Sequence, residues 1–197
     1  MTDPRVTGVV LAAGLSRRLG QPKQLLPYRD STLLGETLAM ARRCGFDQLI
    51  VTLGGAADQI RSAVALDDTQ TVAVDQPASG CSASLRAALN LVAPDSDGIV
   101  LLLGDQPGVA VSSVRRLLAV GAGQPIAVCR YTDGVGHPFW FSRAVFGDIA
   151  ALHGDKAVWK LIEGGRFPVA EVDVNDSVPP DVDTWADYEK LLAGVVP

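Results

Sequence analysis

The chain has 197 residues, of which 48% are hydrophobic and 20% are charged, and its formal net charge is −5. This composition supports one folded domain with a buried core and excludes a disordered chain. Because a nucleic-acid-binding surface needs a basic face, the acidic balance argues against nucleic acid as a partner. No apolar run reaches the roughly 18–20 residues that span a bilayer, and Met1–Pro4 lacks the features of a signal peptide. We therefore expect a cytoplasmic protein with no membrane partner.

The cysteines Cys44, Cys81 and Cys129 are few, odd in number and far apart. This pattern argues against a disulfide framework and against structural zinc. We expect reduced and mostly buried thiols. Cys81 is the exception, because it lies in a segment that we interpret below as functional.

Short apolar runs alternate with longer amphipathic runs along the chain. β-branched, continuously apolar runs predict buried strands, and apolar residues three or four positions apart predict helices. In chain order we expect strand Val6–Leu11, a helix from Leu34 to Cys44 ended by Gly45, strand Leu49–Leu53, helix Ala56–Val64, strand Thr71–Val74, a helix after Ser79-Gly80, strand Ile99–Leu103, helix Val111–Val120, strands Ile126–Val128 and Pro138–Phe141, helices Ala144–Leu152 and Ala157–Ile162, strand Val169–Val172, and a terminal helix Asp183–Leu192.

Alternation of strand and helix, with strands apolar on both faces, predicts a parallel sheet covered on both sides. We expect a single-domain, three-layer α/β fold of Rossmann type with a mostly parallel central sheet, less regular in its last third. Ligands of such sheets bind beyond the carboxyl ends of the strands. Functional residues are therefore expected in four segments, Ala12–Lys23, Gly54-Gly55, Asp75–Ser84 and Gly104–Pro107.

The loop after the first strand reads Leu-Ala-Ala-Gly-Leu-Ser-Arg-Arg-Leu-Gly-Gln-Pro-Lys over residues 11–23. Its small residues allow close approach of the backbone to a ligand, and successive backbone N–H groups in such a turn can bind an anion. Two arginines and a lysine add positive charge, which suits a triphosphate. The spacing matches neither a Walker A loop nor a G-x-G-x-x-G turn. The alternative is an ordinary turn with solvated basic residues.

The pattern Leu-Ala-Ala-Gly-x-Ser-x-Arg-x-Gly-x-x-Lys resembles the signature loop of the MobA-like nucleotidyltransferases, the family of the molybdenum-cofactor cytidylyltransferases and guanylyltransferases. The resemblance implies that the backbone of Gly14–Arg18 wraps the nucleotide phosphates and that Arg18 and Lys23 neutralise their charge. The nucleotide-binding residues that it implies in this loop are Leu11, Ala12, Ala13, Gly14, Ser16, Arg17 and Lys23.

Gly104-Asp105-Gln106-Pro107 follows the most apolar strand. A carboxylate at the end of a buried strand is costly unless it is paired or bound to metal, and Mg²⁺ prefers carboxylates together with phosphate oxygens and water. Asp105 is therefore a candidate ligand of a Mg²⁺ shared with the phosphates, and the match to the family's Gly-Asp-x-Pro metal motif favours this role. The alternative is that Asp105 caps the following turn or helix.

Three further segments resemble family motifs. In residues 76–85, Gly80, Ser82 and Ser84 match an element that contacts the base and ribose, although serines at a helix start are commonly N-caps. In Gly136-His137-Pro138-Phe139-Trp140-Phe141, the histidine matches an acceptor-side motif of the cytidylyl branch, its alternative being a packed structural residue. Asp155 and Lys156 match another acceptor-side element of that branch. The alternative is that they form the N-terminus of a helix, with Asp155 as its cap.

Asp181 and Asp183 face the same side if their stretch is extended. The family shows Asp-x-Asp-Thr-Pro-Glu-Asp here, whereas this chain has Trp185 and Ala186 in place of Pro and Glu. These two replacements are compatible with a helix that starts here with Asp183 or Thr184 as its N-cap. They weaken the case that Asp181 and Asp183 bind metal or acceptor. Asp173 and Asn175 are neighbouring alternatives.

The resemblance, which spans Leu11 to Asp187, implies a Mg²⁺-dependent transfer of a nucleoside monophosphate from an NTP to a phosphorylated acceptor, with Lys23, Arg18 and Asp105 as catalytic residues. The nucleotide-binding part is expected at about residues 5–110 and the acceptor-side part at about 111–197. The second alanine of the loop, Ala13, favours CTP, and a molybdopterin-type cofactor is the expected acceptor, with a molybdoenzyme as a further partner. Alternatives are another phospho-acceptor such as a sugar, polyol or phospho-acid, a non-catalytic nucleotide-binding accessory protein, and an NAD-dependent oxidoreductase, which the lack of a G-x-G-x-x-G turn disfavours.

Overall fold

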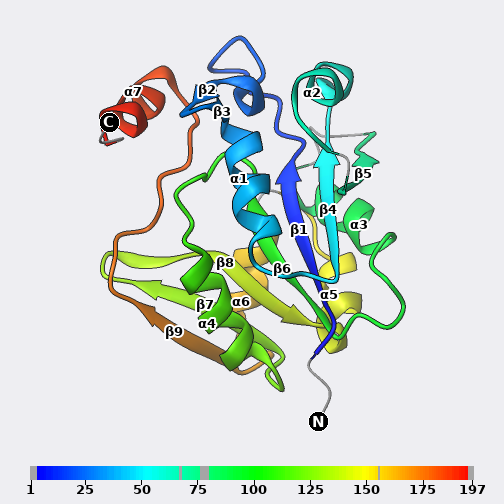
Figure 1. The fold of residues 1–197 in the computed structure, drawn as a ribbon. Coiled ribbons are helices and arrows are strands. Elements are labelled where there is room, and N and C mark those ends of the chain that lie inside the picture. Colours follow the sequence, from blue (N-terminus) through cyan, green and yellow to red (C-terminus); the bar gives the residue numbers. More distant parts are fainter. Residues whose placement is uncertain (1–3, 67, 76–79, 155, 195–197) are drawn as a thin grey trace.

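The computed structural model describes residues 4–66, 68–75, 80–154 and 156–194. Its main sheet contains seven strands in the order β5-β4-β1-β6-β8-β7-β9 (Figure 1). These strands are β1 (Val6–Ala12), β4 (Gln48–Leu53), β5 (Gln70–Ala73), β6 (Gly98–Leu103), β7 (Ile126–Tyr131), β8 (Gly134–Ser142) and β9 (Val169–Val174). A two-stranded hairpin, β2 (Pro27–Tyr28) and β3 (Ser31–Thr32), stands apart from the main sheet.

The sheet is parallel from β5 to β6, and β7 and β9 are also parallel to each other. β8 is antiparallel to both β6 and β7. The prediction of a mostly parallel sheet in an α/β fold is therefore confirmed. Leu101 of β6 pairs with Phe139 of the antiparallel β8. The β8 residues before Phe139 therefore lie towards the carboxyl end of β6, which Asp105 follows.

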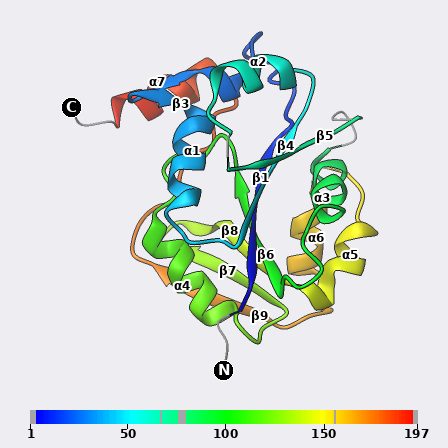
Figure 2. The same cartoon turned by 45° about the vertical axis from the view of Figure 1, so that its right-hand side comes forward.

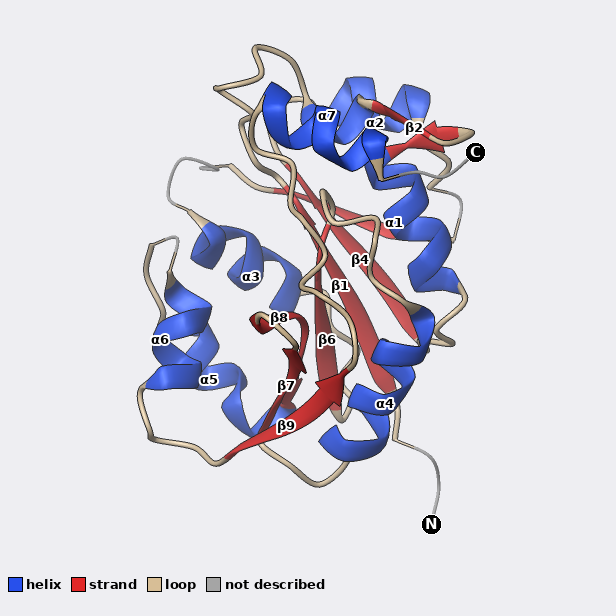
Figure 3. Cartoon of the chain, turned by 90° about the vertical axis from the view of Figure 1, so that its left-hand side faces the viewer, coloured by secondary structure: helices blue, strands red, loops and turns tan. Residues whose placement is uncertain are grey.

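Helices cover both faces of the sheet, as Figures 2 and 3 show. The helices are α1 (Leu33–Arg42), α2 (Ala57–Ala63), α3 (Cys81–Leu89), α4 (Val111–Gly121), α5 (Phe146–Ala150), α6 (Ala157–Glu163) and α7 (Trp185–Ala193), with 3₁₀ turns η1 (Lys23–Leu25) and η3 (Arg143–Val145). Apolar residues of α1, α2 and α4 pack on one face, and those of α3, α5 and α6 pack on the other. Neighbouring residues of β1 pack on opposite faces of the sheet: Val10 packs on the face covered by α1, α2 and α4, and Val9 packs on the face covered by α3, α5 and α6.

A third apolar cluster joins the two ends of the chain. Tyr188 and Leu191 of α7 pack with Leu26, Tyr28 and Leu33 of the early part of the chain. The Tyr188 hydroxyl also donates a hydrogen bond to the carbonyl oxygen of Pro27, at 2.5 Å. Figure 1 shows α7 beside the β2–β3 hairpin. This docking carries the segment before α7 over the carboxyl ends of the central strands.

Several predicted boundaries need correction. The terminal helix begins at Trp185 and not at Asp183, because Thr184 is its N-cap: the Thr184 hydroxyl accepts from the Asp187 N–H while the Asp187 carboxylate accepts from the Thr184 N–H. The helix expected from Ala144 is a 3₁₀ turn followed by the short α5. The strand expected at Pro138–Phe141 runs from Gly134 to Ser142. Among the described residues, no helix is long and apolar enough to cross a membrane.

Candidate functional site

A cavity of about 210 Å³ opens at the carboxyl ends of β1 and β6, the edge of the sheet that the strand pattern indicates. It is bounded by the first loop, the start of α3 and the turn after β6. The lining residues are Leu11, Ala12, Ala13, Gly14, Lys23, Gln24, Gly80, Cys81, Ser84, Leu103, Gly104 and Asp105. Residues far apart in the sequence thus converge on one hollow.

The first loop is closed by its own hydrogen bonds. The Ser16 hydroxyl accepts from the Lys23 backbone N–H at 3.0 Å, and the Ser16 carbonyl accepts from the N–H groups of Leu19 and Gly20. Ser16 and Gly20 both adopt positive φ, +50° and +69°, where the chain reverses. The loop is therefore a preformed turn that leads directly from β1 back to Lys23.

Gly54 at the end of β4 fixes how closely the loop lies against the sheet. A Cβ atom at Gly54 would lie 2.4 Å from the carbonyl oxygen of Ala13, a separation that real Cβ atoms do not adopt. Glycine is thus required at this close approach of two backbones. The approach places Ala13 and Gly14 at the cavity wall.

Lys23 is held between two carboxylates. Its Nζ atom lies 2.5 Å from Oδ2 of Asp105 and 2.7 Å from Oδ1 of Asp183. The Lys23 and Asp105 side chains are only 13% and 12% exposed. Arg18 donates to the other oxygen of Asp183 at 2.6 Å, but its side chain is 65% exposed. Asp183 therefore links the buried Lys23–Asp105 pair to the exposed Arg18.

These contacts set the charges of the site. Burial raises the pKa of Asp105, and the neighbouring Lys23 ammonium opposes that rise. Burial lowers the pKa of Lys23, but the Asp105 and Asp183 carboxylates outweigh it, so the net pKa is above the ordinary value. Hydrogen bonding from Lys23, aided by Arg18, lowers the pKa of Asp183. Lys23 consequently remains an ammonium ion at neutral pH.

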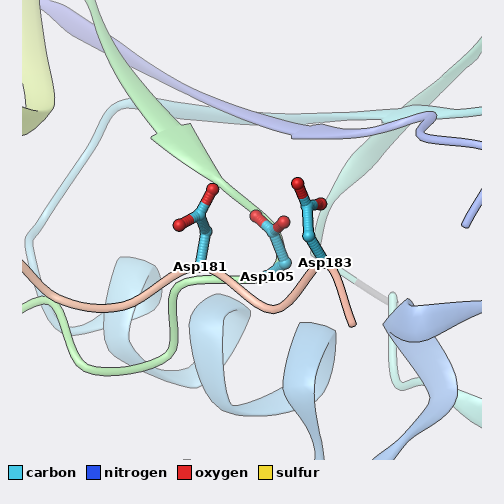
Figure 4. A group of neighbouring side chains, drawn as sticks. All are labelled: Asp105, Asp181 and Asp183. Carbon is cyan, nitrogen blue, oxygen red and sulfur yellow. The ribbon is translucent and has the colours of Figure 1, made fainter. Parts of the chain in front are cut away.

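Asp105, Asp181 and Asp183 form an acidic trio, in which one carboxylate oxygen from each residue lies within 4.8 Å of the other two. Figure 4 shows Asp105 after β6 and the other two on the segment that leads to α7. The same view shows the three side chains next to one another. Carboxylate oxygens are hard donors, the type that Mg²⁺ and Mn²⁺ prefer. The donor set therefore fits a divalent cation, and the lysine and arginine beside it suit the anionic ligand that such a cation accompanies.

Not every predicted nucleotide-binding residue lines this cavity. Ser16 and Arg17 line a separate hollow of about 410 Å³ between the first loop and the start of α2. Ser82 is buried, and its hydroxyl accepts from the Gly154 N–H at 3.0 Å. Its position ties α3 to the loop before α6, so the structure does not place it at the cavity wall with Gly80 and Ser84.

Of the predicted acceptor-side residues, His137 and Lys156 are not among those that line the cavity. His137 is on β8, its ring centroid is 4.1 Å from that of Phe139, and burial lowers its pKa to about 3, so the imidazole is neutral. Tyr131 donates its hydroxyl to the His137 carbonyl at 2.8 Å. Lys156 is exposed at the N-cap of α6. Asp155 lies outside the described residues, as does the 76–79 part of the segment before α3.

The sequence motifs assign no role to two glutamines of the site. Gln24 is buried, and its Nε2 atom donates to the carbonyls of Ala12 at 2.7 Å and Gly14 at 3.1 Å. Gln106 is also buried and donates to the Pro179 carbonyl. Each directly follows a charged residue of the site, Lys23 or Asp105. That adjacency is the one sequence signal that could have marked them.

Comparison with protein families gives a match over residues 8–172 to the MobA-like NTP transferase domain. The chain therefore belongs to the MobA-like NTP transferase family. It is 31% identical, over 96% of its length and 97% of the relative's, to a Paenarthrobacter nicotinovorans protein named nicotine blue oxidoreductase. It is 30% identical, over 97% of its length and 98% of the relative's, to the purine catabolism protein PucB of Bacillus subtilis.

Solved structures agree with this membership. The crystal structure of Rv0371c from Mycobacterium tuberculosis is 62% identical, covers 98% of this chain and 100% of its own, and superposes with a TM-score of 0.93. A structure of Rv0371c in complex with manganese is 60% identical, covers 97% and 100%, and has a TM-score of 0.89. A nucleotidyl transferase of Methanothermobacter, Mth528, is 25% identical with 96% of each chain covered and a TM-score of 0.79.

Proposed function

We propose that this protein is a nucleotidyltransferase that transfers a nucleoside monophosphate, CMP in preference, from an NTP to a phosphorylated acceptor and releases pyrophosphate. The observation that carries the proposal is the convergence of the first loop, Lys23 and Asp105 on one cavity at the carboxyl ends of β1 and β6. Membership of the MobA-like family supports the reaction class. We assign residues of about 5–110 to the nucleotide part and about 111–197 to the acceptor side.

In this proposal, an acceptor phosphate oxygen attacks the α-phosphorus of the NTP. The bond from the α-phosphorus to its bridging oxygen breaks, and that oxygen leaves with pyrophosphate. The acceptor phosphate is already ionised at neutral pH, so no general base is needed. The chain's part is to position the reactants and to oppose developing negative charge. Backbone N–H groups of the first loop and the cations Lys23 and Arg18 perform this role.

Asp105 holds the Mg²⁺ of this proposal, with Asp181 and Asp183 as further ligands. The donor chemistry of the acidic trio supports the assignment, as does the manganese complex of a relative. When bound, the cation neutralises phosphate charge and orients the phosphates. Lys23 bridges two of the three carboxylates and also lines the cavity.

CTP is the favoured nucleotide because Ala13 stands where the guanylyl branch tends to have glycine. A molybdopterin-type cofactor is the favoured acceptor, delivered in turn to a molybdoenzyme. His137 supports an acceptor-side role because β8 carries it towards the Asp105 end of β6, with a neutral imidazole that can donate or accept a hydrogen bond. Lys156 and Asp155 are the remaining acceptor-side candidates.

The rival functions make different demands on the site. A different phospho-acceptor uses the same nucleotide chemistry. A non-catalytic accessory protein needs nucleotide binding but not both Lys23 and Asp105. The name of the Paenarthrobacter relative raises a redox activity, for which this sequence lacks the G-x-G-x-x-G turn. A combined assay separates them.

The deciding experiment incubates the protein with CTP, GTP, ATP or UTP, with Mg²⁺ and molybdopterin, and measures pyrophosphate release. Release with CTP above the other nucleotides is the expected result. Release with another nucleotide retains the reaction and overturns the base assignment. Nucleotide binding detected by thermal shift, with no pyrophosphate released from the NTP when a phosphorylated acceptor is present, favours the accessory protein. NADH consumption at 340 nm with quinone-type substrates, in place of release, favours the oxidoreductase.

A further inference from the structure

The Gln106 side chain links two separate parts of the acidic trio. Gln106 follows Asp105 and is 4% exposed. Its Nε2 atom donates a hydrogen bond of 2.8 Å to the carbonyl oxygen of Pro179. Pro179 lies just before the stretch with Asp181 and Asp183, and Figure 4 shows that this stretch runs alongside the turn after β6. One amide thus connects the turn that carries the first carboxylate to the segment that carries the other two.

Other contacts also hold this segment. Pro179 is itself buried, and Val182 is fully buried in the apolar cluster that contains Tyr188 of α7. Upstream, the Val178 N–H donates to Oδ1 of Asp133 at 2.8 Å, which anchors the chain to the β7–β8 turn. Downstream, Asp183 is held by its ion pairs. A Cβ atom at Gly108 would lie 3.5 Å from the Pro179 ring, so the segment passes close to the turn after Asp105. Gln106 supplies the hydrogen bond at the midpoint.

The amide is retained at a cost. Within the described residues, the Oε1 atom of Gln106 is buried without a hydrogen-bond partner. A buried polar atom without a partner is unfavourable, whereas a methionine of the same shape would fill the space without that cost. The side chain is therefore explained by what its N–H group does. Gln24 repeats the arrangement, since its Oε1 atom also lacks a partner among the described residues and its N–H groups hold the first loop.

We propose that Gln106 is a positioning residue: its hydrogen bond to Pro179 holds Asp181 and Asp183 against Asp105 and so sets the affinity of the trio for a divalent cation. The inference rests on the metal role in the proposed function and assigns a residue that does not itself touch the ion. We call this hydrogen bond the tether. Its loss moves Asp181 and Asp183 away from Asp105 but leaves the number and charge of the three carboxylates unchanged.

The test compares two glutamine-to-methionine variants. Gln106→Met removes the tether. The control is Gln48→Met, because Gln48 also donates to a backbone carbonyl, that of Leu91, but lies at the amino end of β4, the opposite end of the sheet. Mn²⁺ alone is titrated by calorimetry without nucleotide, and the melting temperature of each variant is recorded. We expect Gln106→Met to weaken Mn²⁺ binding roughly 5- to 10-fold, the scale of one buried hydrogen bond. The control lowers the melting temperature at least as much and leaves Mn²⁺ affinity within about twofold.

Hydrogen exchange of the amides between residues 176 and 184 provides a second measurement that does not need the metal. The tether predicts faster exchange there in Gln106→Met than in wild type or in Gln48→Met. Unchanged exchange in this segment, or Mn²⁺ affinity equal to that of the control, overturns the inference. If the wild-type protein binds no Mn²⁺, the metal assignment of the proposed function is overturned instead. The hydrogen-exchange result then decides by itself whether Gln106 holds the segment in place. If Gln106→Met does not fold, Gln106→Asn, whose shorter amide does not reach Pro179, takes its place.

Discussion

Lys23 is the residue on which the site's electrostatics depend, because it is the buried cation between Asp105 and Asp183. Breaking a buried ion pair from one side leaves an uncompensated charge, which costs far more than the net stabilisation from the intact pair. Lys23 therefore contributes both to the fold and to the proposed chemistry. Activity and stability must be measured together to separate its two contributions.

Lys23→Ala and Asp105→Ala are each expected to lower the turnover number by roughly 10²–10³-fold, the usual loss for one preorganised charged contact. Lys23→Ala also lowers the free energy of unfolding by about 3 kcal/mol, because Asp105 becomes a buried charge without its partner. Steady-state pyrophosphate release and urea unfolding measure the two effects. Near-normal turnover in either variant would contradict the proposed roles.

Arg18 offers a contrast within the same network. Its ion pair with Asp183 joins side chains that are 65% and 42% exposed. Pairs that exposed contribute little to stability. Arg18→Ala is therefore expected to change the free energy of unfolding by less than about 1 kcal/mol while it weakens the apparent affinity for NTP. A large loss of stability would show that the pair is more buried in solution than this geometry indicates.

At the scale of elements, α7 matters because its start determines where Asp183 lies. The Thr184 cap and its reciprocal bond with Asp187 fix the first turn of the helix directly after Asp183. Thr32 caps α1 through the same type of bond, from the Gly35 N–H. It lies in β3 beside α7, but unlike Thr184 it does not adjoin Asp183 in the chain. The two threonines therefore form a matched pair.

Thr184→Ala and Thr32→Ala are each expected to cost about 1 kcal/mol of unfolding free energy, the usual effect of a lost N-cap. Only Thr184→Ala is expected also to weaken Mn²⁺ binding, because fraying at the cap releases Asp183. Urea denaturation and Mn²⁺ calorimetry on both variants provide the comparison. Equal Mn²⁺ affinity in the two variants would show that the cap does not position the carboxylate.

The sequence predicts the central elements well because their residues are buried on both faces and are therefore mostly apolar, as in β1, β4 and β6. The position of the cavity follows from the same strands. The antiparallel insertion of β8 between β6 and β7 does not follow, since periodicity carries no information on strand order. The two-residue strands β2 and β3 are too short to leave a pattern.

The candidate site shows the same division between local and long-range information. The sequence motifs indicate Lys23 and Asp105, and the structure brings their charged groups together. The pairing of Lys23 with Asp183 joins residues 160 positions apart and depends on how α7 docks. The departure from the family motif at residues 185 and 186 leaves the Thr184 cap intact, and the structure brings Asp181 and Asp183 next to Asp105.

For the whole molecule, the pH dependence of the unfolding free energy tests whether the His137 imidazole is buried. Burial lowers its pKa in the folded state to about 3, below the ordinary value of 6.5. The unfolded chain therefore binds a proton between these two pH values that the folded chain does not. Folding stability consequently rises with pH through this window and is lost as the pH falls below about 6.5. The pKa of Asp183 is lowered as well, which adds a loss of the same sign at lower pH.

A difference measurement isolates the histidine from these other groups. His137→Gln keeps a polar side chain but removes the titration, so the unfolding free energy of wild type minus that of the variant reports His137 alone. Between pH 7.5 and pH 5 we expect this difference to fall by on the order of 1–2 kcal/mol, since each unit of pKa shift corresponds to about 1.4 kcal/mol. Parallel pH profiles of the two proteins would mean that the imidazole is solvated in solution. A solvated imidazole would become cationic below neutral pH and would attract an acceptor phosphate by charge. A buried, neutral imidazole recognises the acceptor by hydrogen bonding. The outcome therefore also decides which kind of contact His137 can make.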